Sequence, residues 1–213
     1  PVTTMTSIAD TVEKRVSTVG RTMPRQELKI IDPATGETVP RGVQGEICFR
    51  GYNVMNRYYN NEKATRETID DRRWLHSGDL GVMDEEGYIK ITGRIKEMVI
   101  RGGENLYPRE IEEFLRTNNK VMDVYVIGVP DIRYGEELMA WVLPREGETL
   151  TEEEMREFCK GKIAHFKVPR YWKFVKSQSD YPMTVTGKIQ KFKMREIAIV
   201  ELKLQDAASI KTA

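Results

Sequence analysis

The sequence predicts an α+β fold, with a β-rich part at residues 1–95 followed by a small α+β domain at residues 96–204. From residue 28 onward, short apolar segments alternate with turn residues, which is typical of strands. After Arg94 the pattern changes, because helix-start signals alternate with strand-like segments. The final segment, residues 205–213, is expected to be a frayed tail.

The first part is predicted to consist mainly of short strands. Residues 1–27 are polar, rich in Thr and carry few pattern signals. Beyond them the sequence predicts one helix near residues 63–69 and strands at residues 28–31, 46–50, 80–83 and 88–92. Turn residues at 32–36 follow the first strand, and the Asp-Glu-Glu-Gly segment at 84–87 predicts a hairpin between the last two.

The second part mixes helices with strands. Pro108 suits the first turn of a helix whose apolar positions are Ile111, Phe114 and Leu115. Strands are expected at residues 121–129, 138–143 and 171–175, with a turn at 134–135 between the first two.

Two further helices are predicted in the second part. Thr151 followed by Glu154 forms a capping box, in which each side chain bonds to the backbone of the other residue. The helix that it opens is expected to bury Met155, Phe158 and Ile163. A last helix is expected over residues 189–204.

The charge balance argues against two classes of partner. The 34 Lys and Arg nearly equal the 33 Asp and Glu, so net charge indicates neither nucleic acid nor a membrane as the main partner. Along the chain, an acidic stretch at 146–157 gives way to a basic run at 160–176. This shift fits either solvated faces or a basic patch that binds phosphates.

The cysteines and the apolar segments bear on location. Cys48 and Cys159 are isolated, sit in no metal-ligand spacing and predict reduced core cysteines of a cytoplasmic protein without a metal site. No apolar run is long enough for a transmembrane segment, and no signal peptide is visible. Because the chain begins at Pro1, a fragment or a processed product is expected.

A lysine in residues 182–188, Pro-Met-Thr-Val-Thr-Gly-Lys, is a candidate for phosphate chemistry. The segment is no P-loop, because Pro182 stands where that motif has its first glycine. What remains is Lys188 on a glycine turn before a helix, either reaching into a cleft or simply solvated.

Other candidates lie near the boundary between the two parts. Asp79 follows a glycine at the expected end of a strand, where a carboxylate can accept ribose hydroxyls, although ordinary turns also contain Asp. His76 in the same segment is interpreted as structural. Arg94 closes a strand, and the adjacent Gly102 and Gly103 allow close approach of the backbone to a ligand.

Together, four segments in order resemble the adenylate-forming superfamily, which includes acyl- and aryl-CoA synthetases, peptide-synthetase adenylation domains and firefly-type luciferases. Residues 45–59 resemble its GE-x-x-x-RG…VM-x-GY segment, with Arg57 in place of glycine. Residues 74–79 resemble its W-x-x-TGD segment, with Ser77 in place of threonine. Residues 87–97 and 108–112 match its most diagnostic segment, and residues 182–188 match its closing P-x-T-x-(S/T)GK signature.

The resemblance implies a role for each candidate. Asp79 and Arg94 would bind the nucleotide, and Lys96 would be the hinge about which the small, mobile C-terminal domain turns. Lys188 would stabilise charge on the α-phosphate and the acyl carboxylate during adenylation. Four residues would bind coenzyme A: Gly102, Gly103, Phe166 and Lys167.

The resemblance also implies an activity and its cofactors. The chain would hold the end of the large adenylate-forming domain and the small domain of a fatty-acyl or aryl-CoA ligase. This enzyme would use ATP to form acyl-AMP and then pass the acyl group to coenzyme A, in fatty acid metabolism. The family's phosphate loop and the segment supporting adenine and Mg²⁺ are absent from the sequence, so the Mg²⁺ ligands are expected in a preceding part of the enzyme and the chain alone is expected to be inactive.

Two alternatives remain at this point. The chain could belong to an adenylation domain that loads a carrier protein, or it could be a non-catalytic nucleotide-binding fragment. The sequence names neither the acid nor the oligomeric state.

Overall fold

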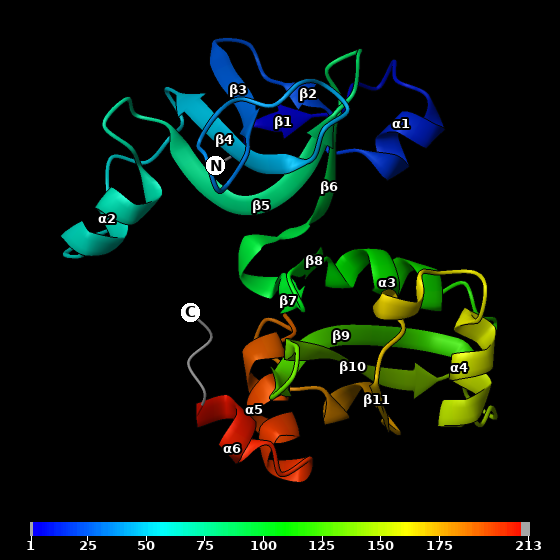
Figure 1. Ribbon diagram of the computed structural model, residues 1–213. Coiled ribbons are helices and arrows are strands. Elements are labelled where there is room, and N and C mark those ends of the chain that lie inside the picture. Colours follow the sequence, from blue (N-terminus) through cyan, green and yellow to red (C-terminus); the bar gives the residue numbers. More distant parts are fainter. Residues whose placement is uncertain (1, 210–213) are drawn as a thin grey trace. The chain divides into compact units, whose positions relative to one another are not determined.

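A computed structural model of the chain describes residues 2–209 and confirms the α+β class (Figure 1). The chain divides into two compact units, and the division falls between Lys96 and Glu97. None of the described helices is both long and apolar enough to cross a membrane.

The first unit is built on a four-stranded antiparallel sheet whose strands follow one another in sequence order. Its strands are β3 (Gln26–Ile31), β4 (Gly45–Gly51), β5 (Leu75–Met83) and β6 (Ile89–Arg94). The short strands β1 (Thr4–Met5) and β2 (Arg21–Thr22) pair separately, and two helices, α1 (Val12–Ser17) and α2 (Glu62–Thr68), complete the unit. Ile30, Ile47 and Ile89 form the centre of its main core cluster.

Strand β5 is longer than the sequence predicts, and it is bent. The sequence places Asp79 at the end of a strand. Because β5 begins at Leu75, Asp79 instead lies within it. The strand curves strongly in Figure 1, and its pairing shifts register against both β4 and β6. Such irregularities bend a strand and re-aim its side chains.

The second unit is built on a five-stranded sheet around β10. Its strands are β7 (Val99–Arg101), β8 (Glu104–Leu106), β9 (Val121–Asp131), β10 (Gly135–Pro144) and β11 (Tyr171–Phe174). β9 runs antiparallel along one side of β10; on the other side lie β7, which pairs at Gly135, and β11, which pairs in parallel from Met139. The helices are α3 (Pro108–Leu115), α4 (Glu152–Cys159), α5 (Lys191–Glu201) and α6 (Gln205–Ser209), and short 3-10 turns are η1 (Ile95–Glu97), η2 (His165–Lys167) and η3 (Gln178–Asp180).

Both faces of β10 are buried, and different helices cover them. Leu138, Ala140 and Val142 face a core cluster that includes Ile111 of α3 and Met155 of α4. Met139 and Trp141 face a second cluster formed with Met194 and Ala198 of α5. This burial explains why the strand is an uninterrupted apolar run, since a strand covered on both faces has no solvent side.

The capping box of α4 is confirmed. The Glu154 backbone N–H donates to Thr151 Oγ1 over 3.2 Å, and Glu154 Oε2 accepts from the Thr151 backbone N–H over 2.9 Å. The helix buries Met155 and Cys159; Phe158 is only half-buried, and Ile163 is a half-buried residue beyond the end of the helix. The helix ends before Ile163, and its buried stripe runs through positions 155 and 159, one turn apart.

The end of the chain differs from the prediction. The last long helix begins at Lys191 and ends at Glu201, because Lys203 adopts a left-handed conformation with φ of 55° that closes the helix. Residues 205–209, expected to be part of a frayed tail, form α6, and Ala207 is buried. Residues 210–213 of the expected tail lie outside the described part.

Candidate functional site

Lys188 sits on a turn that is closed by hydrogen bonds. Met183 and Ile189 form an antiparallel bridge at its base, and the Thr184 N–H donates to the Lys188 carbonyl over 2.8 Å. The Lys188 N–H in turn donates to Thr184 Oγ1 over 3.0 Å. Gly187 has φ of 78°, a left-handed conformation that favours glycine. The lysine is therefore presented on an ordered turn.

The Lys188 side chain is exposed and free of ion pairs. None of the salt bridges formed among residues 2–209 involves its ammonium group. An ammonium that no carboxylate neutralises can accept a phosphate or carboxylate of a ligand without first breaking an internal pair.

Asp79 and Arg94 lie opposite each other on β5 and β6. Arg94 Nε donates to Asp79 Oδ1 over 2.9 Å, and the two side chains are 66% and 34% exposed. The structure thus brings together the two residues expected to bind the nucleotide, on the surface of the first unit. An ion pair so exposed to water contributes little to stability and can be exchanged for a ligand at low cost.

Lys96 lies in the 3-10 turn η1, and it is the last residue of the first unit. The other expected residues lie in the second unit. Gly102 and Gly103 form the turn between β7 and β8, with φ values of 58° and 89°. The Gly102 N–H donates to the Tyr134 carbonyl over 2.8 Å. A Cβ at Gly102 would come within 3.2 Å of the Tyr134 ring, whereas one at Gly103 would meet open space.

Phe166 and Lys167 belong to the 3-10 turn η2. The Phe166 side chain is exposed, and Lys167 forms an ion pair with Glu110 of α3 at 2.5 Å. Lys167 therefore has an internal partner that a phosphate ligand would have to displace.

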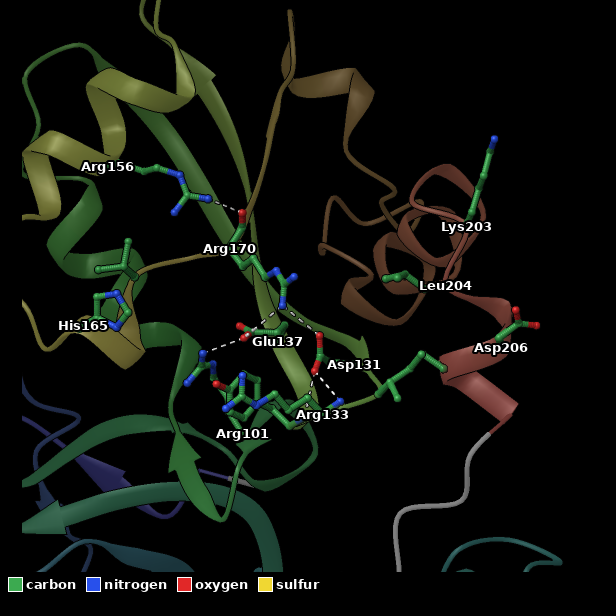
Figure 2. A pocket seen from close by; sticks show the side chains of 14 residues that line it. Arg101, Asp131, Arg133, Glu137, Arg156, His165, Arg170, Lys203, Leu204 and Asp206 are labelled. Atoms are coloured by element: carbon green, nitrogen blue, oxygen red, sulfur yellow. Dashed lines mark hydrogen bonds and ion pairs between the residues drawn. The ribbon is translucent and has the colours of Figure 1, made fainter.

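A pocket of about 640 Å³ opens on the second unit (Figure 2). It is lined by five of the unit's basic side chains and by one histidine: Arg101, Arg133, Arg156, Arg170, Lys203 and His165. None of the four residues expected to bind coenzyme A lines it, although Arg101 directly precedes Gly102 and His165 directly precedes Phe166. The sequence does not indicate this pocket, since its residues come from segments between 101 and 207 that only the fold brings together.

Ion pairs organise one side of this pocket. Glu137, whose side chain is 2% exposed, lies 2.7 Å from Arg101, and Asp131 lies 3.2 Å from Arg170 (Figure 2). Hydrogen bonding to Glu137 raises the pKa of Arg101 further above its ordinary value. Among the salt bridges of the described residues, none neutralises Arg133 or Lys203. These two cations remain available to an anion.

A cluster of the buried Glu46 and Cys48 with the half-buried His76 has the chemistry of metal ligands. His76 Nδ1 lies 2.9 Å from Glu46 Oε2 and 3.7 Å from Cys48 Sγ. Both Glu46 oxygens already have partners, because Oε1 accepts from the Gly78 N–H over 3.0 Å. Burial, and then the charge of Glu46, raises the pKa of the Cys48 thiol to about 12. The three side chains therefore form a hydrogen-bonded network that holds the backbone around Gly78 in place. A metal ion bound there would have to displace the proton of the Cys48 thiol.

This cluster is not evident from the sequence, because the strand register creates it. Cys48 and His76 are paired across β4 and β5, and the shift in register at Glu46 brings the carboxylate alongside them. In the sequence, the spacing of Glu46 and Cys48 by two residues indicates only that they share one face of a strand. His76 can be assigned to the same cluster only from the pairing of β4 with β5.

The chain matches two families of known proteins. Residues 1–59 match the family described as AMP-binding enzyme, and residues 110–188 match the AMP-binding enzyme C-terminal domain. The chain is 53% identical over 199 residues, 93% of its length, to YngI of Bacillus subtilis (strain 168), whose name assigns it provisionally to the acyl-CoA synthetases. It is 52% identical over 196 residues, 92% of its length, to the mitochondrial medium-chain acyl-CoA ligase ACSF2 of Danio rerio.

A solved structure shares the fold. The crystal structure of ATP-bound MatB from Rhodopseudomonas palustris superposes with a TM-score of 0.85 and 35% sequence identity, over 92% of this chain and 38% of that one. The chain spans about a third of the length of the curated relatives that it matches, 36% of YngI and 32% of the zebrafish ligase.

Proposed function

Because this chain belongs to the AMP-binding enzymes of the adenylate-forming superfamily, we propose that it is the C-terminal portion of an acyl-CoA synthetase. The enzyme would join a carboxylic acid to ATP, releasing pyrophosphate and forming acyl-AMP. Coenzyme A would then displace AMP to give the thioester. The observation that carries the proposal is the unpaired ammonium of Lys188 on its ordered turn, within the signature that closes the family's C-terminal domain.

Lys188 is proposed to act in the first half-reaction. During adenylation, negative charge builds up on the α-phosphate and the attacking carboxylate. A fixed ammonium placed against that charge stabilises the transition state more than the ground state. The ordered turn supports this role, because a group that is already in place needs no reorganisation during the reaction.

Asp79 and Arg94 are proposed to bind the nucleotide. A carboxylate can accept hydrogen bonds from both ribose hydroxyls, and the guanidinium can contact the ribose or phosphate. Their 2.9 Å ion pair keeps both groups side by side on the sheet. A bound nucleotide would replace this partly exposed ion pair with its own contacts to the two side chains.

Coenzyme A is proposed to bind the second unit. Gly102 and Gly103 would line the passage for the pantetheine chain, while Phe166 and Lys167 would contact the nucleotide end. The basic pocket beside them supports this assignment, because Arg133 and Lys203 are cations without a carboxylate partner among the described residues.

The substrate class and the location are further parts of the proposal. We propose a fatty acid as the substrate, in line with the medium-chain acyl-CoA ligase name of the zebrafish relative. A cytoplasmic location is proposed as well; the zebrafish relative is named mitochondrial, so fractionation of cells is the deciding measurement. Mg²⁺ would accompany ATP, and we assign no ligand for it within this chain.

The test of the proposal is pyrophosphate release by the complete enzyme that contains this chain, across a panel of fatty and aryl acids. Mass spectrometry then identifies the thioester after coenzyme A is added. The isolated 213-residue chain is the control, and we expect no pyrophosphate release from it. Release from the isolated chain, or the absence of any thioester from the complete enzyme, would contradict the proposal.

The variant Lys188→Ala tests the assigned role directly. We expect it to lower acyl-AMP formation by about 10²-fold, the usual cost of losing one electrostatic donor, and to leave thioester formation from supplied acyl-AMP nearly unchanged. Lys193→Ala, a change at an exposed lysine of α5, is the matched control and should leave both rates unchanged. Equal losses in both half-reactions would show that Lys188 has a different role.

A further inference from the structure

Lys191 occupies a position that helix stability does not explain. It is the first residue of α5, three residues after Lys188, and its side chain is only 16% exposed. Its N-cap residue, Gln190, makes no side-chain capping hydrogen bond, and the first turn contains a second cation, Lys193. The dipole of a helix disfavours cations at its N-terminal end. A half-buried lysine there needs compensation from elsewhere in the fold.

Two carboxylates supply that compensation. Lys191 Nζ lies 2.7 Å from Glu97 Oε2 and 2.8 Å from Glu112 Oε1. Glu97 is the first residue of the second unit, directly after Lys96. Glu112 belongs to α3, its side chain is 7% exposed, and its Oε1 also accepts from the Val126 N–H of β9 over 2.8 Å. One ammonium group thus connects the start of the unit with α3 and α5.

The backbone between Lys191 and Lys188 transmits this constraint. The Gln190 N–H donates to the Pro182 carbonyl over 2.8 Å, next to the bridge between Met183 and Ile189. The Lys188 carbonyl then accepts from the Thr184 N–H. Since Lys188 and Gln190, on either side of Ile189, are both hydrogen-bonded across the turn, a shift of Lys191 would move the Lys188 turn with it.

We propose that Lys191 is a positioning residue for adenylation, which fixes the Lys188 turn to the buried Glu112 and to Glu97, next to the expected hinge residue Lys96. This inference rests on the proposed role of Lys188. The Lys191–carboxylate contacts set where the Lys188 ammonium lies relative to the first residue of the unit that carries it. A rotation of the backbone at Lys96 would then carry Lys188 along with Glu97 and α3.

The first test compares Lys191→Met with Lys193→Met in the complete enzyme. Methionine keeps the length and the apolar part of the side chain but removes the charge. We expect Lys191→Met to lower kcat for acyl-AMP formation by about 10-fold or more, since small misplacements of a catalytic group are costly, with a smaller change in KM for ATP. Thioester formation from supplied acyl-AMP should stay within about 2-fold of the parent enzyme, because Lys188 would act in the first step alone. Lys193→Met should change neither step.

Rescue distinguishes charge from packing. Lys191→Arg restores a cation that can contact two carboxylates, and we expect it to recover acyl-AMP formation to within about 3-fold of the parent rate. A purely structural role predicts another result: both half-reactions would fall together, in proportion to the folded fraction measured by circular dichroism at the assay temperature. That outcome would overturn the proposal.

A second variant keeps the proposal testable if Lys191→Met does not fold. Glu97→Gln removes one partner's charge at a less buried position, and we expect a selective loss of acyl-AMP formation of about 3-fold. In the double variant with Lys191→Met, the losses should not add, because both changes break the same contact. Additive losses would contradict the inference.

If Lys188→Ala is harmless, the proposed function fails. If Lys188→Ala is damaging and Lys191→Met is not, the positioning role alone fails.

Discussion

The two cysteines lie in different units, and Cys48 is beside Glu46 and His76. Cys48, on β4, and Cys159, at the end of α4, are both free and fully buried. Burial raises the pKa of Cys48 to about 12 and that of Cys159 to about 11. The thiolate is the reactive form, so a raised pKa makes both side chains inert at neutral pH.

We therefore expect the native chain to react very slowly with Ellman's reagent at about pH 8, where both groups are protonated thiols. Two thiols per chain should react at once in denaturant. The colour released over time gives the measurement, with the denatured sample as its control. Rapid labelling of the folded chain would contradict this prediction, and comparison with Cys48→Ala and Cys159→Ala would identify the reactive position.

At the level of single residues, the sequence indicates candidate side chains but not the residues that pair with them. Lys188 and the glycine pair stand out as local motifs. The pairing of Asp79 with Arg94 depends on the register of β5 and β6, which a local pattern does not encode. The contact of Lys191 with Glu97 joins residues 94 positions apart, and Lys191 resembles any other lysine at the start of a helix.

At the level of helices and strands, predictions succeeded where apolar periodicity was strong. Each strand expected from residue 121 onward was found, because β9, β10 and β11 carry apolar residues that pack in the core. The start of β5 was missed because its first residues include His76, Ser77 and Gly78, which are poor strand signals. Tertiary pairing with β4 holds them in the extended conformation. The break after α5 was missed because Lys203, not glycine, takes the left-handed position.

The capping box of α4 gives a prediction at this scale. Thr151→Ala removes the side-chain acceptor for the Glu154 N–H, and we expect it to lower the free energy of unfolding by about 1 kcal/mol. Chemical denaturation monitored by circular dichroism measures the change.

Glu154→Gln is the matched control for the Thr151 variant. Hydrogen bonding to the Thr151 N–H, followed by Lys120, lowers the pKa of Glu154 below its ordinary value. Glutamine keeps an oxygen that can accept from the same N–H, so this change should destabilise the helix less than Thr151→Ala. A larger loss for Glu154→Gln would mean that the charge of Glu154 matters more than the hydrogen bonds of the box.

At the scale of the whole molecule, the division between Lys96 and Glu97 motivates a test of the proposed hinge. A hinge residue changes its backbone dihedral angles between two poses. Proline fixes φ near about −65° and removes the N–H, so Lys96→Pro should trap one pose. In the complete enzyme, we expect one half-reaction, acyl-AMP formation, to be largely retained and thioester formation to be strongly reduced.

Stopped-flow measurement of each half-reaction checks this prediction. Lys96→Ala is the control, because it removes the side chain but leaves the backbone free to rotate. It should not cause the selective loss of thioester formation that is expected for Lys96→Pro. If proline slows both steps in parallel, Lys96 is a solvated residue of a linker and not a pivot.

The order of strands in the second sheet determines when it can be completed as the chain leaves the ribosome. The first unit's meander pairs neighbours along the sequence and needs nothing beyond Arg94. β10, in contrast, gains its parallel neighbour only when residues 171–174 have been made, since α4 and η2 lie between them. Until then, the stretch from Met139 to Val142 presents unpaired N–H and C=O groups on an apolar strand, the kind of edge that recruits other chains. Translation that ends before Tyr171 would thus release a chain prone to aggregate, although its first sheet could already be folded.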